Sequence, residues 1–346
     1  MLHCLEILAT LSPSPLPDTP DILRPLLGAF VDLVPGARPV GNHGDFDTAA
    51  QLAAFEVLKY VACHCADVEN KLKRLPSFYG RLPELSEYFR LRIVSLNYDD
   101  LPLQANIALD TGHDPAEAGW RFRPGRLFDP ANVSHLLMQL HGSVRLAHRW
   151  KPRQGGYSIA WHSTREEAAE EWRIQEPLSH AQDGSYVTSL PIVTGLRKAD
   201  KVALVDPFST YHAAFTAVAH RAAAWLVVGY GNGDAHVNQV LRSAMEARTT
   251  TDDAPRILVV DYPPIIGKSE AWHEVADRVF GARRGAGQWS ISVQLCHPSV
   301  PSPNSVAPAD FLRLSPHVTA TFGGTDVAFG SGWQSALRIL RTGSEF

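Results

Sequence analysis

The chain has 346 residues, a formal net charge of -4 and 45% hydrophobic residues. That length suits one large α/β domain or two smaller ones, and the weak negative charge gives no broad attraction to nucleic acid. No apolar run approaches the roughly 20 residues needed to cross a bilayer, and the first residues lack the basic start and cleavage site of a signal peptide. We therefore expect a cytoplasmic protein that binds no membrane and does not bind nucleic acid directly.

Helical patterns come first along the chain. Residues 12–20 are rich in proline and predict a linker. Apolar residues then recur at helical spacing in 21–34 and in 47–65, where Asp47 is a plausible N-cap, and a third helix is predicted for 82–89. We assign residues 1–44 to an N-terminal helical and linker segment.

The four cysteines form no pair of C-x-x-C knuckles, so we predict no metal site. The residues of Cys63-His64-Cys65 have metal-ligating chemistry, but they end a helical pattern in which adjacent side chains point in different directions. We interpret the two cysteines as thiols on or near a packed helix.

Strand and helix patterns alternate from residue 91 onward. The predicted strands are 91–96, 134–140, 189–195, 224–230 and 255–261. The predicted helices are 101–110, 209–223, 234–248, 269–281 and 332–341. Several strands are apolar at every position, as in Leu226-Val227-Val228, which is typical of strands buried on both faces of a parallel sheet. The sequence therefore predicts an α/β fold with a doubly wound, mostly parallel, Rossmann-like sheet.

Two segments break this alternation. Residues 144–190 contain short, polar stretches with glycine, and we interpret them as a small inserted lobe. Residues 298–346 begin with a stretch rich in proline and serine and end in one predicted helix. The main nucleotide-binding domain is accordingly predicted to span 45–297.

Polar residues follow several predicted strands at the point where each strand ends. The first strand is followed by Asn97, Tyr98, Asp99 and Asp100, and the second by His141. The later strands lead into Gly229, Gly231, Gly233 and Asp234, and into Asp261. Ligands of doubly wound sheets bind outside the carboxyl ends of the strands, so we expect these groups to meet there.

Each of these residues also has a purely structural interpretation. Asn97 suits a turn, Asp99 and Asp234 suit helix N-caps, and His141 suits a buried, hydrogen-bonded histidine. The glycines allow a tight turn, and the helix after them offers free N–H groups to an anion. The combination of these features is more specific than any one of them.

The order Asn97-Tyr98-Asp99, then Leu140-His141-Gly142-Ser143, then Gly229-Tyr230-Gly231 with Asp234 before a helix, resembles the sirtuin-like domain family. The resemblance covers about residues 45–282 and is closest to the bacterial branch associated with anti-phage defence, which hydrolyses NAD. It implies NAD as substrate, release of nicotinamide and ADP-ribose, and either self-association or a partner defence protein.

The resemblance also implies roles for individual residues. Asn97 and His141 would be catalytic, with Asn97 against the nicotinamide ribose and His141 as general base. The remaining contacts to NAD would come from Asp99, which faces the carboxamide, and from Gly142, Ser143, Gly229, Gly231, Asp234 and Asp261. An imidazole with a pKa near neutrality is suited to activating water or a ribose hydroxyl.

One family motif has no counterpart here. The family opens with a strand followed by Gly-Ala-Gly-x-Ser, of which Leu27-Gly28-Ala29-Phe30 matches only a part. We expect that the chain starts too late or has lost this phosphate loop, and that it hydrolyses NAD poorly or not at all as written. A non-catalytic nucleotide- or partner-binding module is the first alternative. An NAD-dependent protein deacylase is the second, although residues 144–190 lack the cysteines of a zinc ribbon.

Overall fold

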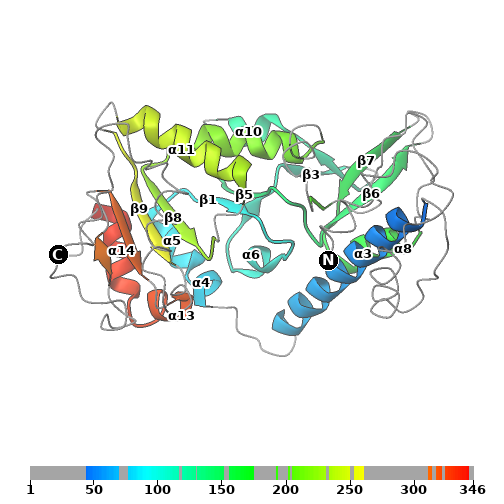
Figure 1. Ribbon diagram of the computed structural model, residues 1–346, viewed down its shortest axis with the longest axis horizontal. Coiled ribbons are helices and arrows are strands. Elements are labelled where there is room, and N and C mark those ends of the chain that lie inside the picture. The colour runs from blue at the N-terminus through cyan, green and yellow to red at the C-terminus, as the bar shows by residue number, and fades with distance from the viewer. Residues whose placement is uncertain are drawn as a thin grey trace, which may run out of the picture. The chain divides into compact units, whose positions relative to one another are not determined.

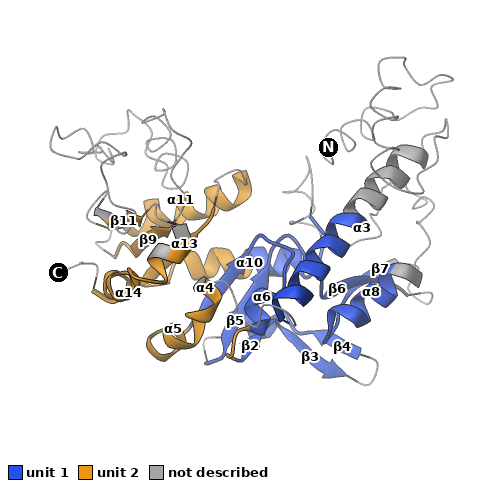
Figure 2. Ribbon diagram, turned by 90° about the horizontal axis from the view of Figure 1, so that it is seen from below, with its two compact units in different colours: residues 1–73, 91–104, 108–212 blue, residues 74–90, 105–107, 213–346 orange. Residues whose placement is uncertain are grey.

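The fold is described from a computed structural model of the chain (Figure 1). The described residues are 44–69, 77–116, 119–129, 131–151, 156–174, 192–193, 202, 205–230, 234–249, 253–260, 311–313, 317–321 and 324–342. The chain divides into two compact units (Figure 2). Unit 1 comprises residues 1–73, 91–104 and 108–212, and unit 2 comprises residues 74–90, 105–107 and 213–346.

Unit 1 is built around a three-stranded parallel sheet in the order β1-β5-β2. The central strand, β5 (His135–Gln139), pairs with β1 (Arg92–Ser95) on one side and β2 (Leu109–Asp110) on the other. The three apolar residues of β5 are at most 1% exposed, which agrees with their prediction as a strand buried on both faces. The first two predicted strands are thereby confirmed.

The predicted helix at 101–110 is only partly correct. Helix α6 covers Leu101–Gln104, whereas Leu109 and Asp110 form β2 and pair with His135 and Leu136. Pairing with a central, buried strand outweighs the weak local preference of such a segment for helix.

The segment predicted as an inserted lobe is more regular than its composition suggested. It contains a hairpin of β6 (Leu146–Lys151) and β7 (Gly156–Trp161), followed by α8 (Arg165–Ile174). A second hairpin in unit 1 joins β3 (His113–Ala116) to β4 (Gly119–Phe122). Helix α7 (Gly125–Phe128) follows β4.

Helix α3 (Gly44–Asp67) packs on this lobe through apolar side chains. It begins at Gly44, so Asp47 lies within it and is not its N-cap. The shared core consists of Leu58, Val144, Ala147, Ala168, Trp172 and Ile192. The lobe is therefore part of the hydrophobic core of unit 1.

Unit 2 contains a four-stranded sheet in the order β10-β11-β9-β8. The predicted strands β8 (Ala224–Val228) and β9 (Arg256–Val260) are confirmed and pair in parallel. Strand β11 (Val318–Thr321) also pairs in parallel with β9, and β10 (Leu312–Arg313) lies antiparallel at the edge. The predicted C-terminal segment had no strands, so β10 and β11 are additions to it.

The helices of unit 2 largely follow the sequence pattern. The predicted helices are confirmed as α5 (Leu82–Tyr88), α11 (Ala235–Thr249) and α14 (Trp333–Thr342). Two short helices, α4 (Ser77–Gly80) and α13 (Gly324–Ala328), were not predicted. The helix predicted at 209–223 is confirmed as α10 (Phe208–Ala219), of which residues 208–212 belong to unit 1 and the rest to unit 2.

The described elements thus form a mixed α/β fold with more than one sheet of parallel strands. The predicted boundaries near residues 44 and 297 stay predictions, because each adjoins or lies within a segment outside the described residues. The helices predicted at 21–34 and 269–281 also lie outside them, as does most of the strand predicted at 189–195. Within the described part of the chain, no helix combines the length and apolar character of a membrane span.

Candidate functional site

The register of β1 and β5 brings Asn97 and His141 to the same edge of the unit 1 sheet. Ser95 and Gln139, the last residues of the two strands, are paired, and the Leu140 N–H donates to the Ser95 carbonyl at 3.0 Å. Asn97 and His141 each lie two residues beyond this pair. The predicted meeting of the two residues at the carboxyl end of neighbouring parallel strands therefore agrees with the sheet register.

Asn97 and His141 differ in exposure. Asn97 is exposed, and no hydrogen bond links its side-chain amide to another described residue. Its backbone is held by Ser95, whose Oγ accepts from the Asn97 N–H at 3.2 Å. His141 is only 2% exposed. The site thus combines an exposed amide on a fixed backbone with a buried imidazole.

The segments that follow β1 and β5 are joined by direct hydrogen bonds. The Val144 N–H donates to the Tyr98 carbonyl at 2.8 Å, and the Gln139 side chain donates to the Asp99 carbonyl at 3.0 Å. The Tyr98 hydroxyl donates to the Val193 carbonyl at 3.2 Å. We call residues 96–100 the first site loop and residues 140–145 the second site loop.

Three other predicted site residues of unit 1 have visible structural roles. The Asp99 carboxylate accepts from the Leu101 N–H at 3.1 Å, so it caps the start of α6. Gly142 has φ of 101°, a conformation that residues with a Cβ rarely adopt. Ser143 is buried, and its Oγ accepts from the Arg145 N–H at 3.2 Å.

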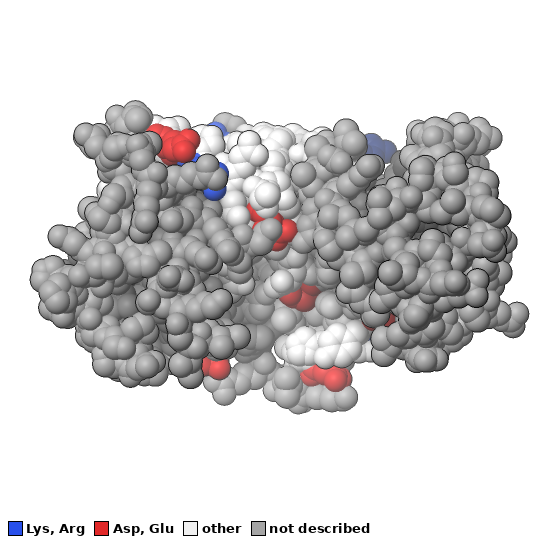
Figure 3. Space-filling model, viewed as in Figure 1, with Lys and Arg blue, Asp and Glu red and all other residues white. Residues whose placement is uncertain are grey.

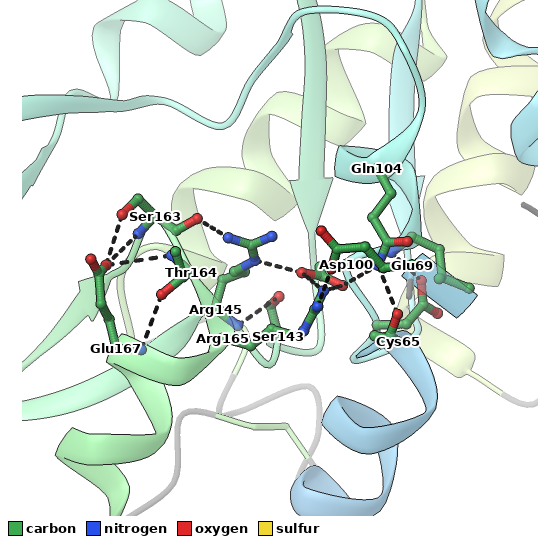
Figure 4. A network of polar contacts seen from close by, with 12 residues as sticks. Cys65, Glu69, Asp100, Gln104, Ser143, Arg145, Ser163, Thr164, Arg165 and Glu167 are labelled. Atoms are coloured by element: carbon green, nitrogen blue, oxygen red, sulfur yellow. Dashed lines mark hydrogen bonds and ion pairs between the residues drawn. The ribbon is translucent and has the colours of Figure 1, made fainter. Parts of the chain in front are cut away.

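Asp100 is the most deeply buried carboxylate of the first site loop, and two arginines surround it (Figure 4). The Arg165 Nη1 donates to both carboxylate oxygens at 2.9 Å, and the Arg145 Nε donates to Oδ2 at 2.5 Å. The Gln104 side chain donates to Oδ1 at 3.2 Å and also to the Cys65 carbonyl at 3.2 Å. A fully buried carboxylate needs such partners because an unpaired charge in this position is very costly.

This network extends to the helices on either side. The Arg165 Nη2 also pairs with Glu69, next to the end of α3 (Figure 4). Burial lowers the pKa of Arg165, but its hydrogen bond to Glu69 and the charge of Asp100 outweigh this effect and raise the pKa. Arg165 is therefore a permanent cation between two carboxylates.

Burial is also the main cause that raises the pKa of the Cys65 thiol to about 12, and the negative charge of Asp100 adds to it. Such a thiol is protonated at neutral pH and a poor nucleophile. Cys63 is exposed whereas Cys65 is buried, so the two thiols occupy different environments. This arrangement fits the interpretation of both as thiols of a packed helix.

The predicted phosphate turn belongs to unit 2. Gly229 has φ of 58°, its N–H donates to the Val260 carbonyl at 2.9 Å, and a Cβ added to it would meet nothing within 4 Å. Asp234 precedes α11. The Tyr230 hydroxyl lies within hydrogen-bonding distance of two acceptors, the Asp234 carbonyl at 3.1 Å and the Asn238 Oδ1 at 2.8 Å. Open space at Gly229 is compatible with close approach of a ligand to the backbone. Gly231 and Asp261 lie outside the described residues.

Sequence reasoning missed Gln139, Arg145 and Arg165, which fix the first site loop. The sequence contained one pattern that could have located Arg165. Thr164 and Glu167 form a capping box: the Glu167 N–H donates to the Thr164 Oγ1 at 3.1 Å, and the Glu167 carboxylate accepts from the Thr164 N–H at 3.4 Å. This pattern would have located the start of α8, and hence Arg165, in a segment that was read as irregular.

No family model matches the chain, and no curated protein is significantly similar to it. On the face drawn in Figure 3, the basic side chains of described residues form no broad patch. The expectation that the protein does not bind nucleic acid directly stays a prediction.

Proposed function

We propose that the protein is an NAD hydrolase that releases nicotinamide and ADP-ribose. The observation that supports the proposal is the sheet register, which brings the segments that carry Asn97 and His141 to the same edge of the sheet, beyond β1 and β5. The sequence motifs around these two residues resemble those of sirtuin-like domains, and this resemblance indicates NAD as the substrate. A Rossmann-like arrangement of the sheets, which such a domain requires, is part of the same proposal.

The chemistry needs few groups. The bond between C1′ of the ribose and the nicotinamide nitrogen breaks, and its electron pair leaves with neutral nicotinamide. The ribose passes through an oxocarbenium-like state, as in glycoside cleavage, and water forms the new bond to C1′. His141 accepts the proton of that water, and the exposed amide of Asn97 holds the sugar in place.

The remaining roles follow from the resemblance. Asp99 would face the nicotinamide carboxamide, and Gly142 and Ser143 would line the same edge. The turn at Gly229 and Gly231, together with Asp234, would contact the phosphates or the adenosine ribose, and Asp261 the ribose hydroxyls. We further propose that the protein acts in the cytoplasm as an effector of anti-phage defence, as a self-associated protein or with a partner defence protein.

A non-catalytic binding module is the second candidate, and one observation favours it. The polar end of β1 is well explained without a ligand, because Asp99 caps α6 and Asp100 is saturated by two arginines. In that case the first site loop would be a rigid binding surface for a nucleotide or a partner protein. A protein deacylase remains as third candidate on the family resemblance alone.

The test is sensitive detection of products from NAD without any peptide. The purified full chain is incubated with NAD, and nicotinamide and ADP-ribose are quantified by mass spectrometry over long times, because without a Gly-Ala-Gly-x-Ser loop we expect slow turnover. Release of both products supports the hydrolase. Binding of NAD by calorimetry without release favours the binding module, and release that depends on an acyl-lysine peptide favours the deacylase.

A further inference from the structure

We propose that Arg145 is a positioning residue of this site: through its ion pair with Asp100 it sets the second site loop, which carries His141, against the first site loop, which carries Asn97. The inference rests on the proposed function for its catalytic consequence. The contact itself is independent of any substrate. Arg145 does not belong to the sequence motifs from which the site was predicted, and the resemblance assigns no role to Asp100.

The position of the two residues in the chain supports this role. Asp100 ends the first site loop, three residues after Asn97, and Arg145 ends the second site loop, four residues after His141. Their contact, Arg145 Nε to Asp100 Oδ2 at 2.5 Å, therefore joins the far ends of the two loops. The near ends are already joined by the pairing of Ser95 with Gln139. Each loop is thus fixed at both ends relative to the other.

The pair is anchored so that it cannot shift easily. The Asp100 side chain is 0% exposed, and Arg165 holds both of its oxygens from the start of α8. The Arg145 side chain is 14% exposed, and its Nη1 donates to the Ser163 carbonyl (Figure 4). Asp100 and Ser163 therefore hold the guanidinium of Arg145 from two sides, and water competes little for the contact with the buried Asp100.

Removing Arg145 should loosen the loops without unfolding the unit. Asp100 would keep Arg165, whose Nη1 donates to both of its oxygens, so no buried carboxylate would be left unpaired. Between the site loops, the Val144 to Tyr98 and Gln139 to Asp99 hydrogen bonds would remain. Without Arg145, the two site loops should move more relative to each other, and His141 should move relative to Asn97. A misplacement of about 1 Å can cost on the order of 100-fold in rate.

The experiment compares Arg145→Met and Arg145→Lys with a matched control, Arg126→Met. Arg126 pairs with Asp110 at 2.7 Å and also with Asp114, so its loss removes a comparable carboxylate partner within unit 1. Asp110 is level with Leu136 near the start of β5, away from the edge that bears His141. Each full-length protein is tested for nicotinamide release at varied NAD and for hydrogen exchange of the Val144 amide.

For Arg145→Met we expect kcat to fall about 10- to 100-fold with KM changed little, and exchange at Val144 to accelerate. Arg145→Lys should recover much of kcat because its ammonium group still pairs with Asp100. Arg126→Met should change neither kcat nor exchange at Val144. An unchanged kcat in Arg145→Met, with an active parent, would overturn the positioning role and leave the hydrolase proposal standing.

The exchange measurement separates the two proposals. If the parent releases no nicotinamide, the proposed function fails, and the Val144 amide still reports whether Arg145 holds the loops together. Unchanged exchange in Arg145→Met overturns the inference in either case. Equal loss of activity and of folded protein in all three variants also overturns it, because the effect would then be one of stability.

Discussion

The Arg165 guanidinium donates to both carboxylate oxygens of Asp100 at 2.9 Å, although the two residues lie 65 positions apart in the chain. One comes from the loop after β1 and the other from the start of α8. This contact connects the sheet of unit 1 to the segment that the sequence presented as a separate lobe. It is the main reason why a buried strand can be followed closely by a fully buried carboxylate.

Replacing Arg165 with methionine should therefore destabilise unit 1. Breaking a buried ion pair by removing one partner typically costs about 3 to 5 kcal/mol, and the remaining bond from Arg145 to Asp100 should hold the loss near the lower end. Urea unfolding followed by circular dichroism measures the change. Lys59→Met is the control, since the pair with Glu56 is exposed on α3 and should contribute less than about 0.5 kcal/mol. Equal effects of the two variants would contradict the structural role of Asp100.

The stability of unit 1 should decrease as the pH falls from 6.5 to 4. Burial is the main cause that lowers the pKa of His113 from 6.5 to about 4. Between these values the unfolded chain binds a proton that the folded chain excludes, so acidification favours unfolding by about 3 kcal/mol at the lower limit. Burial lowers the pKa of His148 to about 4 as well, and it acts in the same direction.

The variant His113→Phe isolates this contribution. The ring of His113 lies 4.9 Å from Phe122 and 5.8 Å from Trp161, so phenylalanine keeps these ring contacts and removes the titrating group, at the cost of the hydrogen bond between the His113 Nδ1 and the Thr111 carbonyl. Unfolding free energies measured from pH 7 to pH 4 should show a shallower pH dependence than in the parent. Identical slopes in the two proteins would show that His113 does not exclude a proton when folded.

Substitution of His141 or Asn97 by alanine should inactivate the protein, if it is a hydrolase. Loss of a general base typically costs about 100- to 10,000-fold in rate. If His141 only satisfies buried groups, His141→Ala should instead lower stability by about 1 to 3 kcal/mol and reduce activity in step with folding, whereas Asn97→Ala, at an exposed position, should change stability little. Tm and nicotinamide release, measured on the same samples, distinguish these outcomes.

His135→Ala provides the control for the histidine. His135 lies at the opposite end of β5, where its Nδ1 accepts from the Leu91 N–H at 3.0 Å. This variant should retain turnover even if its Tm falls. Full turnover in His141→Ala would exclude His141 as the base.

Alanine should be tolerated at Gly229 better than at Gly112. Both glycines have positive φ, which costs a residue with a Cβ about 1 to 2 kcal/mol. At Gly112 the new Cβ would also lie 3.1 Å from a Phe122 ring carbon and 3.2 Å from a Leu127 methyl carbon, adding about 1 to 3 kcal/mol. Thermal unfolding of the two variants tests the difference.

The Gly229→Ala variant has a second use. At this position the added Cβ meets no atom of a described residue within 4 Å, so the variant should fold. If the turn approaches the phosphates of NAD, the methyl group should still weaken NAD binding measured by calorimetry. Unchanged affinity would argue against Gly229 as a phosphate contact.

The sequence by itself determined the elements that have strong local patterns. Strands β5, β8 and β9 are continuous apolar runs, and α14 has regularly spaced apolar residues, so their types were predictable without tertiary information. The same patterns indicated parallel pairing, because strands without a polar face must be covered on both sides. The polar residues that follow β1 and β5 predicted that Asn97 and His141 lie at the same edge of the sheet, and the register of the two strands agrees with this prediction.

The tertiary structure decided what local patterns cannot encode. The short strands β2 and β11 exist because each pairs with a central strand, β5 or β9, that was formed from distant residues. In the sequence, Asp100 was only one of several polar residues in the first site loop. The tertiary structure showed that Arg145 and Arg165 are its partners. A buried charge is stable only where opposite charges converge on it in space, and that convergence follows from packing rather than from spacing along the chain.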